Sequence, residues 1–220
     1  MIKLDNISIW PFRSMSLEIK KGRIYKIIAD SDFEKNLFIQ IILGVIKPER
    51  GSVLLFGKNL WSIRKEEFIK LFKRVGMVLE NGGLISNLKV GENIILPAWY
   101  HNGRKPQDEF KRVSAVYARI GFHATEIKEY LSKSPGALPS HEKRIIALMR
   151  AMLMEPALMI YDALVEGLEP EMMGKVLDVT QEYHMEMRGR TSIFISSEEK
   201  SLKGVRADET MKLSGGGLSS

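Results

Sequence analysis

The sequence has 220 residues, of which 45% are hydrophobic and 27% are charged, and it contains no cysteine. This length and composition suit one soluble globular domain with a sizeable core, and the lack of cysteine excludes disulfides and thiolate metal sites. The sequence shows no signal peptide and no apolar run near the roughly 18 residues of a membrane span, so we expect a cytosolic protein.

The net charge of +6 would allow contact with nucleic acid or anionic lipid. However, the basic residues alternate with acidic ones, as in "WSIRKEEFIKLFKRV" at 61–75, which indicates solvated helix faces. The four histidines show no metal-ligand spacing. We therefore expect no nucleic-acid partner, and a basic module for nucleic acid or anionic lipid ranks last among the hypotheses.

The hydrophobic periodicity of the first part of the chain predicts mostly strands, with two helices. Gly44 is suited to end the first of these helices. In chain order we expect a strand at 2–9, a strand, turn and strand at 14–29, a helix at 33–43, a strand between turns at 47–60, a helix at 64–75 and a buried strand at 76–80.

The second part of the chain predicts a block of helices followed by alternating strands and helices. This order indicates an α/β core with an inserted helical lobe. In chain order we expect a Gly-rich loop at 81–93 with a helix start at 90–100, helices at 107–122, 124–133 and 140–156, a buried strand at 157–163, a helix at 170–187, a strand at 191–197 and a loose tail at 214–220.

The segment "IIADSDFEKNLFIQIILG" at 27–44 has the plan of a phosphate-binding loop, namely strand, loop, lysine and helix. Such a loop needs glycines, because its backbone must approach the phosphates closely. Here no glycine lies between Ile27 and Lys35, and Asp30, Asp32 and Glu34 occupy the loop.

Five segments in a fixed order resemble the nucleotide-binding subunit of an ABC transporter over nearly the whole chain. A narrower resemblance, to the ATPase subunits of bacterial phospholipid-trafficking importers of the lipid-asymmetry and Mce types, rests on "NGGLISNLKVGENIILPAWYH" at 81–101 alone. The five segments lie at 29–36, 76–97, 135–156, 157–170 and 191–199.

The resemblance implies the ABC ATPase fold, which has a mixed, largely parallel sheet core of the P-loop NTPase kind, an antiparallel β subdomain and an inserted α-helical subdomain. We expect the α/β core at 1–83 and 155–213. The helical subdomain and signature helix are expected at 84–154, and the flexible tail at 214–220.

By resemblance, the loop glycines map to Ala29, Asp32 and Glu34, Lys35 is retained, and the Mg²⁺-binding hydroxyl maps to Asn36. A carboxylate at ~4 Å from a phosphate costs on the order of 4 kcal/mol at an effective dielectric of ~20. One hypothesis is that Asp32 or Glu34 supplies the anion that a helix N-terminus favours and pairs with Lys35. The other hypothesis is that the sequence of the loop drifted after the site had lost its use. Both predict weak or absent ATP binding, so we expect no cofactor.

The other motifs of the family are also altered. Asp162, the usual Mg²⁺ partner, is retained, whereas Glu166 has two interpretations, a substitute base or, as we favour, a turn residue. For the aromatic residues Trp10 and Phe12 we expect core packing. The Q-loop glutamine maps to Glu80, the catalytic glutamate to Ala163, the switch histidine to Ser197 and the signature to Leu138, Pro139, Ser140, His141 and Glu142.

The apolar core positions are kept although the motifs are altered, which indicates that the folded shape still matters. By resemblance, this shape dimerises, with a copy of itself or another ABC subunit, and receives an integral membrane permease. Alternatively, the leucine and isoleucine side chains of the contact groove only pack the lobe. The expected permease contacts are Asn81, Leu84, Ile85, Leu88, Trp99 and Tyr100.

The leading hypothesis is a pseudo-ATPase that serves as a scaffold or regulator at the inner face of the cell membrane. A working ATPase with unorthodox residues is the alternative, and Lys35 and Asp162 are its only support. The narrower resemblance of 81–101 implies a role in lipid transport, whereas the sequence identifies neither the particular cargo nor the permease.

Overall fold

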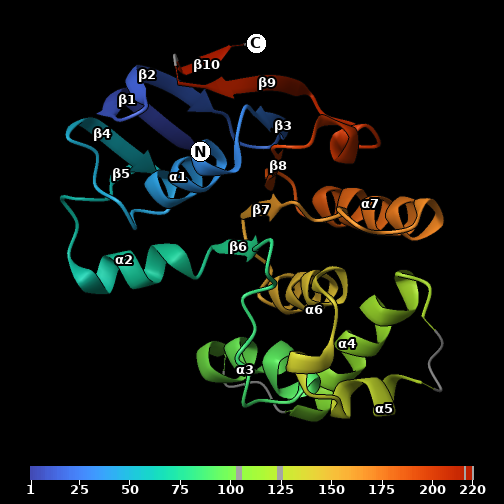
Figure 1. The fold of residues 1–220 in the computed structure, drawn as a ribbon. Helices are drawn as coiled ribbons and strands as arrows, with labels where there is room; N and C mark the ends of the chain where they lie inside the picture. The colour runs from blue at the N-terminus through green and yellow to red at the C-terminus, as the bar shows by residue number, and fades with distance from the viewer. Residues whose placement is uncertain (103–105, 123–125, 216, 220) are drawn as a thin grey trace.

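A computed structural model describes residues 1–102, 106–122, 126–215 and 217–219 (Figure 1). It contains two β-sheets, helices packed around the larger sheet, and a helical lobe at the opposite end of the molecule from the smaller sheet. The predicted α/β core with a helical lobe is confirmed. No helix in these ranges has the length and hydrophobicity that crossing a membrane requires.

The larger sheet has six strands in the order β10-β9-β3-β8-β7-β6. Every pairing in it is parallel except that of β9 with β10. All residues of β7 and β8 are buried, as expected for strands covered on both faces. The strands are β3 (Ile24–Ala29), β6 (Val75–Val78), β7 (Leu158–Asp162), β8 (Thr191–Ser196), β9 (Glu209–Ser214) and β10 (Gly217–Ser219).

The smaller sheet is antiparallel, with the order β2-β1-β4-β5. The pairing of β1 with β4 shifts register between Asp5 and Ser8, where Gly51 approaches the backbone of β1. The strands are β1 (Ile2–Ile9), β2 (Phe12–Ile19), β4 (Arg50–Leu55) and β5 (Lys58–Asn59).

Helix α6 lies between the larger sheet and the helical lobe, and it contacts β6, α3 and α4 (Figure 1). Most of its residues from Arg144 onward are buried, because both of its sides are covered. The helices are α1 (Asp32–Ile42), α2 (Lys65–Phe72), α3 (Val90–Asn102), α4 (Pro106–Arg119), α5 (Ile127–Ser132), α6 (Ser140–Leu153) and α7 (Pro170–Met185).

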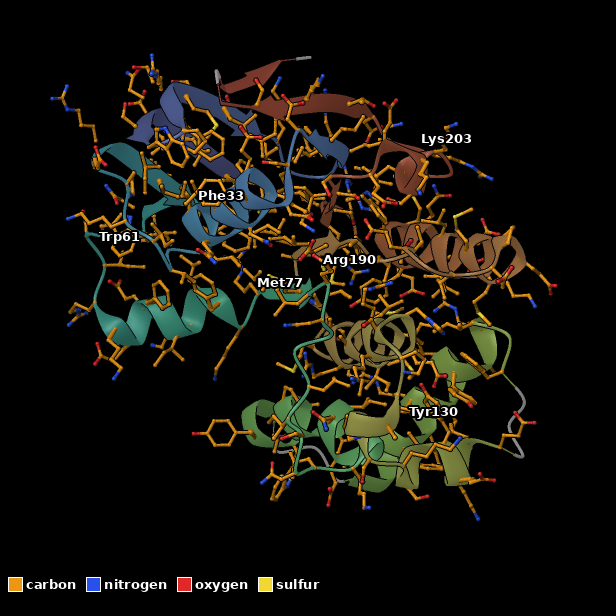
Figure 2. All side chains as sticks on the ribbon, viewed as in Figure 1. Phe33, Trp61, Met77, Tyr130, Arg190 and Lys203 are labelled. Carbon is orange, nitrogen blue, oxygen red and sulfur yellow. The ribbon has the colours of Figure 1, made fainter. Side chains whose placement is uncertain are left out.

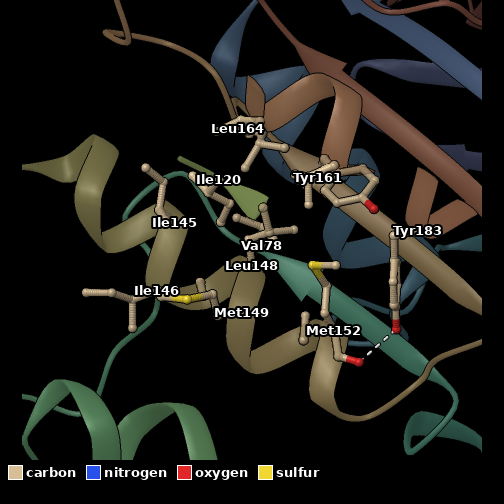
Figure 3. Packing of buried hydrophobic residues seen from close by; sticks show 14 of the residues in the cluster. Val78, Ile120, Ile145, Ile146, Leu148, Met149, Met152, Tyr161, Leu164 and Tyr183 are labelled. Carbon is tan, nitrogen blue, oxygen red and sulfur yellow. Dashed lines mark hydrogen bonds between the residues drawn. The ribbon is translucent and has the colours of Figure 1, made fainter. Parts of the chain in front are cut away.

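The core around α6 packs isoleucine, leucine and methionine against aromatic residues of β7 and α7 (Figure 3). The Tyr183 hydroxyl donates to the Met152 carbonyl at 2.8 Å, so this buried polar group is satisfied (Figure 3). The guanidinium of Arg190, labelled in Figure 2, lies 3.5 Å from the centroid of the Tyr183 ring.

Two expectations are wrong. The tail at 214–220 was expected to be loose, but residues 217–219 form β10, which pairs with β9. The sequence analysis did not predict β9, because the polar–apolar alternation of 209–214 is short.

Trp10 was expected in the core, but it is 73% exposed and packs on Phe33, whereas Phe12 is buried as expected. Trp10 lies at the turn between β1 and β2, beyond the sheet interior.

Candidate functional site

The candidate site lies at the edge of the larger sheet where its parallel strands end, the usual location of ligand sites in such sheets. Strand β3 leads to Lys35, β6 to Glu80, β7 ends at Asp162, and β8 leads to Ser197. Because β3, β8, β7 and β6 are neighbours in this order, these residues meet although they are far apart in the chain.

Helix α1 begins with a side-chain cap. Ser31 has an extended backbone, and its Oγ accepts a hydrogen bond from the Glu34 backbone N–H at 3.2 Å. The same hydroxyl donates to the Glu34 carboxylate at 3.1 Å. This arrangement is a variant of the capping box. Its Ser-x-x-Glu pattern is visible in the sequence, but the sequence analysis did not predict it. The Glu34 carboxylate is therefore engaged in a hydrogen bond with the Ser31 hydroxyl.

The Lys35 side chain is 1% exposed and is surrounded by three carboxylates. Its Nζ lies 2.7 Å from Glu80 Oε2, 3.1 Å from Asp162 Oδ1 and 3.1 Å from Asp32 Oδ1. Asp32, rather than Glu34, is thus the loop carboxylate that pairs with Lys35. The contributions of Glu80 and Asp162 were not anticipated.

Burial and pairing act in opposite directions on the pKa values of this cluster. Burial lowers the pKa of Lys35, but the hydrogen bond to Glu80 and the charge of Asp162 outweigh it, and the pKa lies above its ordinary value. Burial raises the pKa of the Asp162 carboxyl, although Lys35 opposes this. Lys35 therefore remains an ammonium ion without any ligand.

Asp32 links the start of α1 to the loop after β8. Its Oδ1 accepts a hydrogen bond from Ser197 Oγ at 2.7 Å while its side chain stays 66% exposed. The hydrogen bond from Ser197, followed by that from Lys35, lowers the pKa of Asp32. The expected switch position is therefore joined directly to the expected phosphate loop.

Ala163 and Glu166, which follow β7 in the chain, each form a hydrogen bond with a residue of β8. Ala163 is buried, has a φ of +52°, and donates its backbone N–H to the Ile195 carbonyl at 3.0 Å. The Glu166 carboxylate accepts a hydrogen bond from Ser196 Oγ at 2.5 Å. This bond favours the interpretation of Glu166 as a turn residue.

The expected signature segment separates into two groups. Ser140, the first residue of α6, lines a cavity of about 290 Å³ together with Asn36, Glu80 and Asp162. In contrast, His141 and Glu142 line a different cavity, and Leu138 is half-buried. Pro139 occupies the N-cap position of α6 and makes no side-chain capping bond. Ala29, the last residue of β3, is buried.

Arg144 is a central residue of the site that sequence reasoning missed. It is 4% exposed, and its guanidinium donates to the carbonyls of Glu80 at 3.0 Å, Leu164 at 3.2 Å and Glu166. Burial lowers its pKa. Because its hydrogen bonds go to backbone carbonyls, no charge pattern in the sequence reveals this role.

The expected permease contacts divide by exposure. Ile85, Trp99 and Tyr100 are exposed at 44%, 57% and 79%. Leu84, in contrast, packs against the core cluster around α6. Leu88 is half-buried, and the Asn81 side chain accepts a hydrogen bond from the Gly83 backbone N–H at 2.9 Å.

The described part of the chain holds no group of three or more histidine, aspartate or glutamate side chains arranged to bind a metal ion. The carboxylates of the site face Lys35 instead, and the Asp162 Oδ2 atom accepts a hydrogen bond from the Glu80 backbone N–H at 3.1 Å.

The parallel sheet, the antiparallel sheet, the inserted lobe and the loop before α1 together define an ATP-binding cassette. The chain belongs to the ABC transporter family, whose model matches residues 12–165. It is 25% identical over 202 residues to the methionine import ATP-binding protein MetN 2 of Pseudomonas aeruginosa, covering 92% of this chain and 58% of that protein. It is 27% identical to MetN of Escherichia coli O157:H7, covering 93% and 60%.

The chain thus spans somewhat over half the length of these curated relatives. Its fold is that of the bacterial ABC transporter cassette MJ0796, with a TM-score of 0.86, 20% identity, and coverage of 100% of this chain and 97% of that one. The fold also matches CbiO1 of Clostridium perfringens, with a TM-score of 0.77, 21% identity, and coverage of 100% and 86%. The ABC ATPase fold is confirmed.

Proposed function

We propose that this chain is an ABC transporter subunit that neither binds nor hydrolyses ATP, and that serves as a scaffold or regulatory subunit of a membrane permease. The observation that carries this proposal is the Lys35 ammonium, buried and surrounded by three carboxylates. In a phosphate-binding loop this lysine pairs with the phosphates of the nucleotide, whereas here protein side chains take that place.

The residues present do not fit Mg²⁺-ATP. A triphosphate beside Lys35 would face Asp32, Glu80 and Asp162. One such contact at ~4 Å costs on the order of 4 kcal/mol, which corresponds to about a thousandfold in affinity. At the expected position of the catalytic base, Ala163 offers only a methyl group, so we assign no hydrolytic step to this site.

The proposed partner is an integral membrane permease, on whose cytoplasmic side the chain would dock as one member of a dimer. Exposed Ile85, Trp99 and Tyr100 support a contact surface on the lobe. A cavity of about 410 Å³ adds a recess for a helix with an apolar face, because it is lined by apolar residues of α2, β6 and α6, by Pro97 of α3 and by two basic side chains. A lipid cargo stays a prediction from segment 81–101, since the curated relatives above carry the name of methionine importers.

The test is the melting temperature of the purified protein with and without millimolar Mg²⁺-ATP. A ligand present at about 100 times its dissociation constant stabilises a protein by ~2.7 kcal/mol, which would raise the melting temperature by several degrees. We expect no shift. A saturable shift that disappears in Lys35→Ala would overturn the proposal and favour the alternative, an active or ATP-binding subunit.

A matched variant tests the electrostatic reason. Asp32→Gly, Glu34→Gly and Glu80→Gln combined would remove the side chains that fill the loop and contact Lys35. We expect this variant to gain a measurable shift with Mg²⁺-ATP, provided that its circular dichroism shows a folded protein. If Mg²⁺-ATP does not shift the melting temperature of the variant either, carboxylate repulsion is not what excludes ATP.

A further inference from the structure

The cavity of about 410 Å³ between α2, β6 and α6, called the basic recess, differs in charge from the site around Lys35. Two basic side chains line it, Lys73 and Arg150, and no carboxylate of a described residue does so. At Lys35, in contrast, three carboxylates surround one cation. Because the other lining residues are apolar, the basic recess attracts a negative charge on an otherwise apolar partner.

Arg150 is a half-buried cation that makes no ion pair within the described part of the chain. Its guanidinium donates to the carbonyls of Gly83 at 2.9 Å and Gly82 at 3.1 Å. Burial lowers the pKa of Arg150 and no carboxylate opposes this effect, whereas nearby carboxylates do oppose it for Arg144. A carboxylate supplied by a partner would compensate for the lost hydration of the Arg150 guanidinium.

Lys73 is the second cation of the basic recess. It is exposed at the C-cap position of α2, and it forms no ion pair with any described carboxylate. Lys70, three residues earlier on α2, is exposed as well but does not line the recess. The two lysines therefore form a matched pair, of which only Lys73 is placed to meet a molecule in the recess.

The apolar lining of the basic recess comes largely from α2 and the edge strand β6. The Phe68 and Phe72 rings are stacked with centroids 4.3 Å apart, and Ile69 is 46% exposed. Met77 of β6, labelled in Figure 2, also lines the recess. Strand β6 pairs with β7 alone, at one end of the sheet. An apolar helix face laid against these side chains would remove their surface from water, which favours binding.

The loop at 82–89, which Arg150 contacts, is held in one conformation by side chains. Asn93 is 1% exposed, and its Oδ1 accepts a hydrogen bond from the Ile85 backbone N–H at 2.8 Å. Its Nδ2 donates to the carbonyls of Ile85 at 3.0 Å and Leu88 at 3.1 Å. The exposed Ile85 side chain is thus presented by an ordered loop, which reduces the entropy cost of binding a partner.

We propose that the basic recess binds a permease helix that has an apolar face and at least one carboxylate directed at Lys73 and Arg150. This inference rests on the proposed function and adds the chemistry of the partner. The apolar face would lie on Phe72 and Met77, and the carboxylate would supply the counter-ion that Arg150 lacks. A basic helix would add a third cation without compensating either side chain, so the recess selects against it.

The test is photo-cross-linking in the cells that produce the chain. Benzoylphenylalanine replaces exposed Ile69 in one variant and exposed Trp99 in another, and mass spectrometry identifies the cross-linked segment. From Ile69 we expect a cytoplasmic segment of an integral membrane protein that contains aspartate or glutamate. If that segment lacks a carboxylate, or if only Trp99 captures a membrane protein, this inference is overturned and the proposed function stands. Capture from neither position would overturn the docking on a permease as well.

Charge reversal tests the carboxylate directly. Lys73→Glu, added to the Ile69 cross-linking variant, should reduce the yield about tenfold, because an attraction becomes a repulsion. Lys70→Glu, the matched control on α2, should leave the yield unchanged. Replacing the carboxylate of the captured segment by lysine should restore the yield with Lys73→Glu. Equal yields from the two folded glutamate variants, or no restoration by the lysine, would overturn the proposal.

Discussion

Lys35 is the residue whose environment decides the character of the site. A buried ammonium is tolerated in a protein only when opposite charges compensate for its lost hydration. Glu80 and Asp162 provide this compensation from other elements, and Asp32 adds to it from the same helix. The lysine is therefore part of the folded structure and needs no ligand to be stable.

Lys35→Met should consequently destabilise the protein. The variant leaves buried Asp162 facing Glu80 without the cation between them. We expect a loss of about 3 kcal/mol in the free energy of unfolding, at the lower end for a broken buried pair because Asp32 and Glu80 are partly exposed. Urea unfolding measures it, with Lys3→Met, at an exposed position of β1, as the control. Equal losses in both variants would contradict the structural role.

The Asp32 carboxyl provides a pH-dependent readout of the link to Ser197. Its pKa lies below its ordinary value of 3.8, so its contribution to stability is present above about pH 4 and is lost as the pH falls through the lowered pKa. Ser197→Ala removes the largest cause, and the pKa of Asp32 should rise toward 3.8. Carboxyl NMR titration checks this, and an unchanged pKa would exclude the hydrogen bond in solution.

At the scale of the element, the start of α1 depends on its cap. Ser31→Ala removes the oxygen that accepts the Glu34 backbone N–H, and we expect a loss of about 1 kcal/mol in the free energy of unfolding. A double-mutant cycle with Glu34→Ala measures the coupling through the side-chain bond. Zero coupling would mean that the carboxylate contributes nothing to the cap.

The bulge between β1 and β4 depends on Gly51. Its φ is +92°, and a Cβ there would lie 2.4 Å from the Asp5 carbonyl oxygen. Gly57 has a similar φ of +78° with open space around its missing Cβ. Gly57→Ala should cost about 1 kcal/mol from its backbone conformation, and Gly51→Ala about 3 kcal/mol because the clash is added. Chemical denaturation compares them, and equal costs would rule out the clash.

Most elements could be predicted from the sequence because their hydrophobic pattern is local. The helix predicted at 33–43 is α1 at Asp32–Ile42, and buried β7 and β8 were predicted from their apolar runs. Strand β9 was missed because its alternation is short and its inward residues, Met211 and Leu213, are only two.

The candidate site could be predicted only in part. The pairing of Asp32 with Lys35 follows from their spacing on one helix, i and i+3. The pairing of Lys35 with Glu80 and Asp162 requires the strand order of the sheet, which local sequence does not determine.

For the molecule as a whole, helix α6 connects the sheet edge to the lobe. Its two arginines hold backbone segments on either side of the site. Arg144 donates to the carbonyls of residues 80, 164 and 166. Within the described part of the chain, Arg150 donates only to the carbonyls of Gly82 and Gly83. The segment after β6 and the segment after β7 are thus coupled through one side chain.

Arg144→Lys should loosen both segments together. A lysine ammonium cannot span three carbonyls as the planar guanidinium does, so we expect a loss of about 3 kcal/mol in the free energy of unfolding. Hydrogen exchange should quicken at the amides of both 79–83 and 163–167.

The comparison variant Arg150→Lys should quicken exchange at 79–83 alone, since the hydrogen bonds of Arg150 to described residues all reach that segment. This difference separates the coupling through Arg144 from a general loosening of α6. Faster amide exchange in Arg144→Lys at only one of the two segments would show that the segments move independently. Arg144 would then not couple them, and the sheet edge would be held together by Lys35 and its carboxylates.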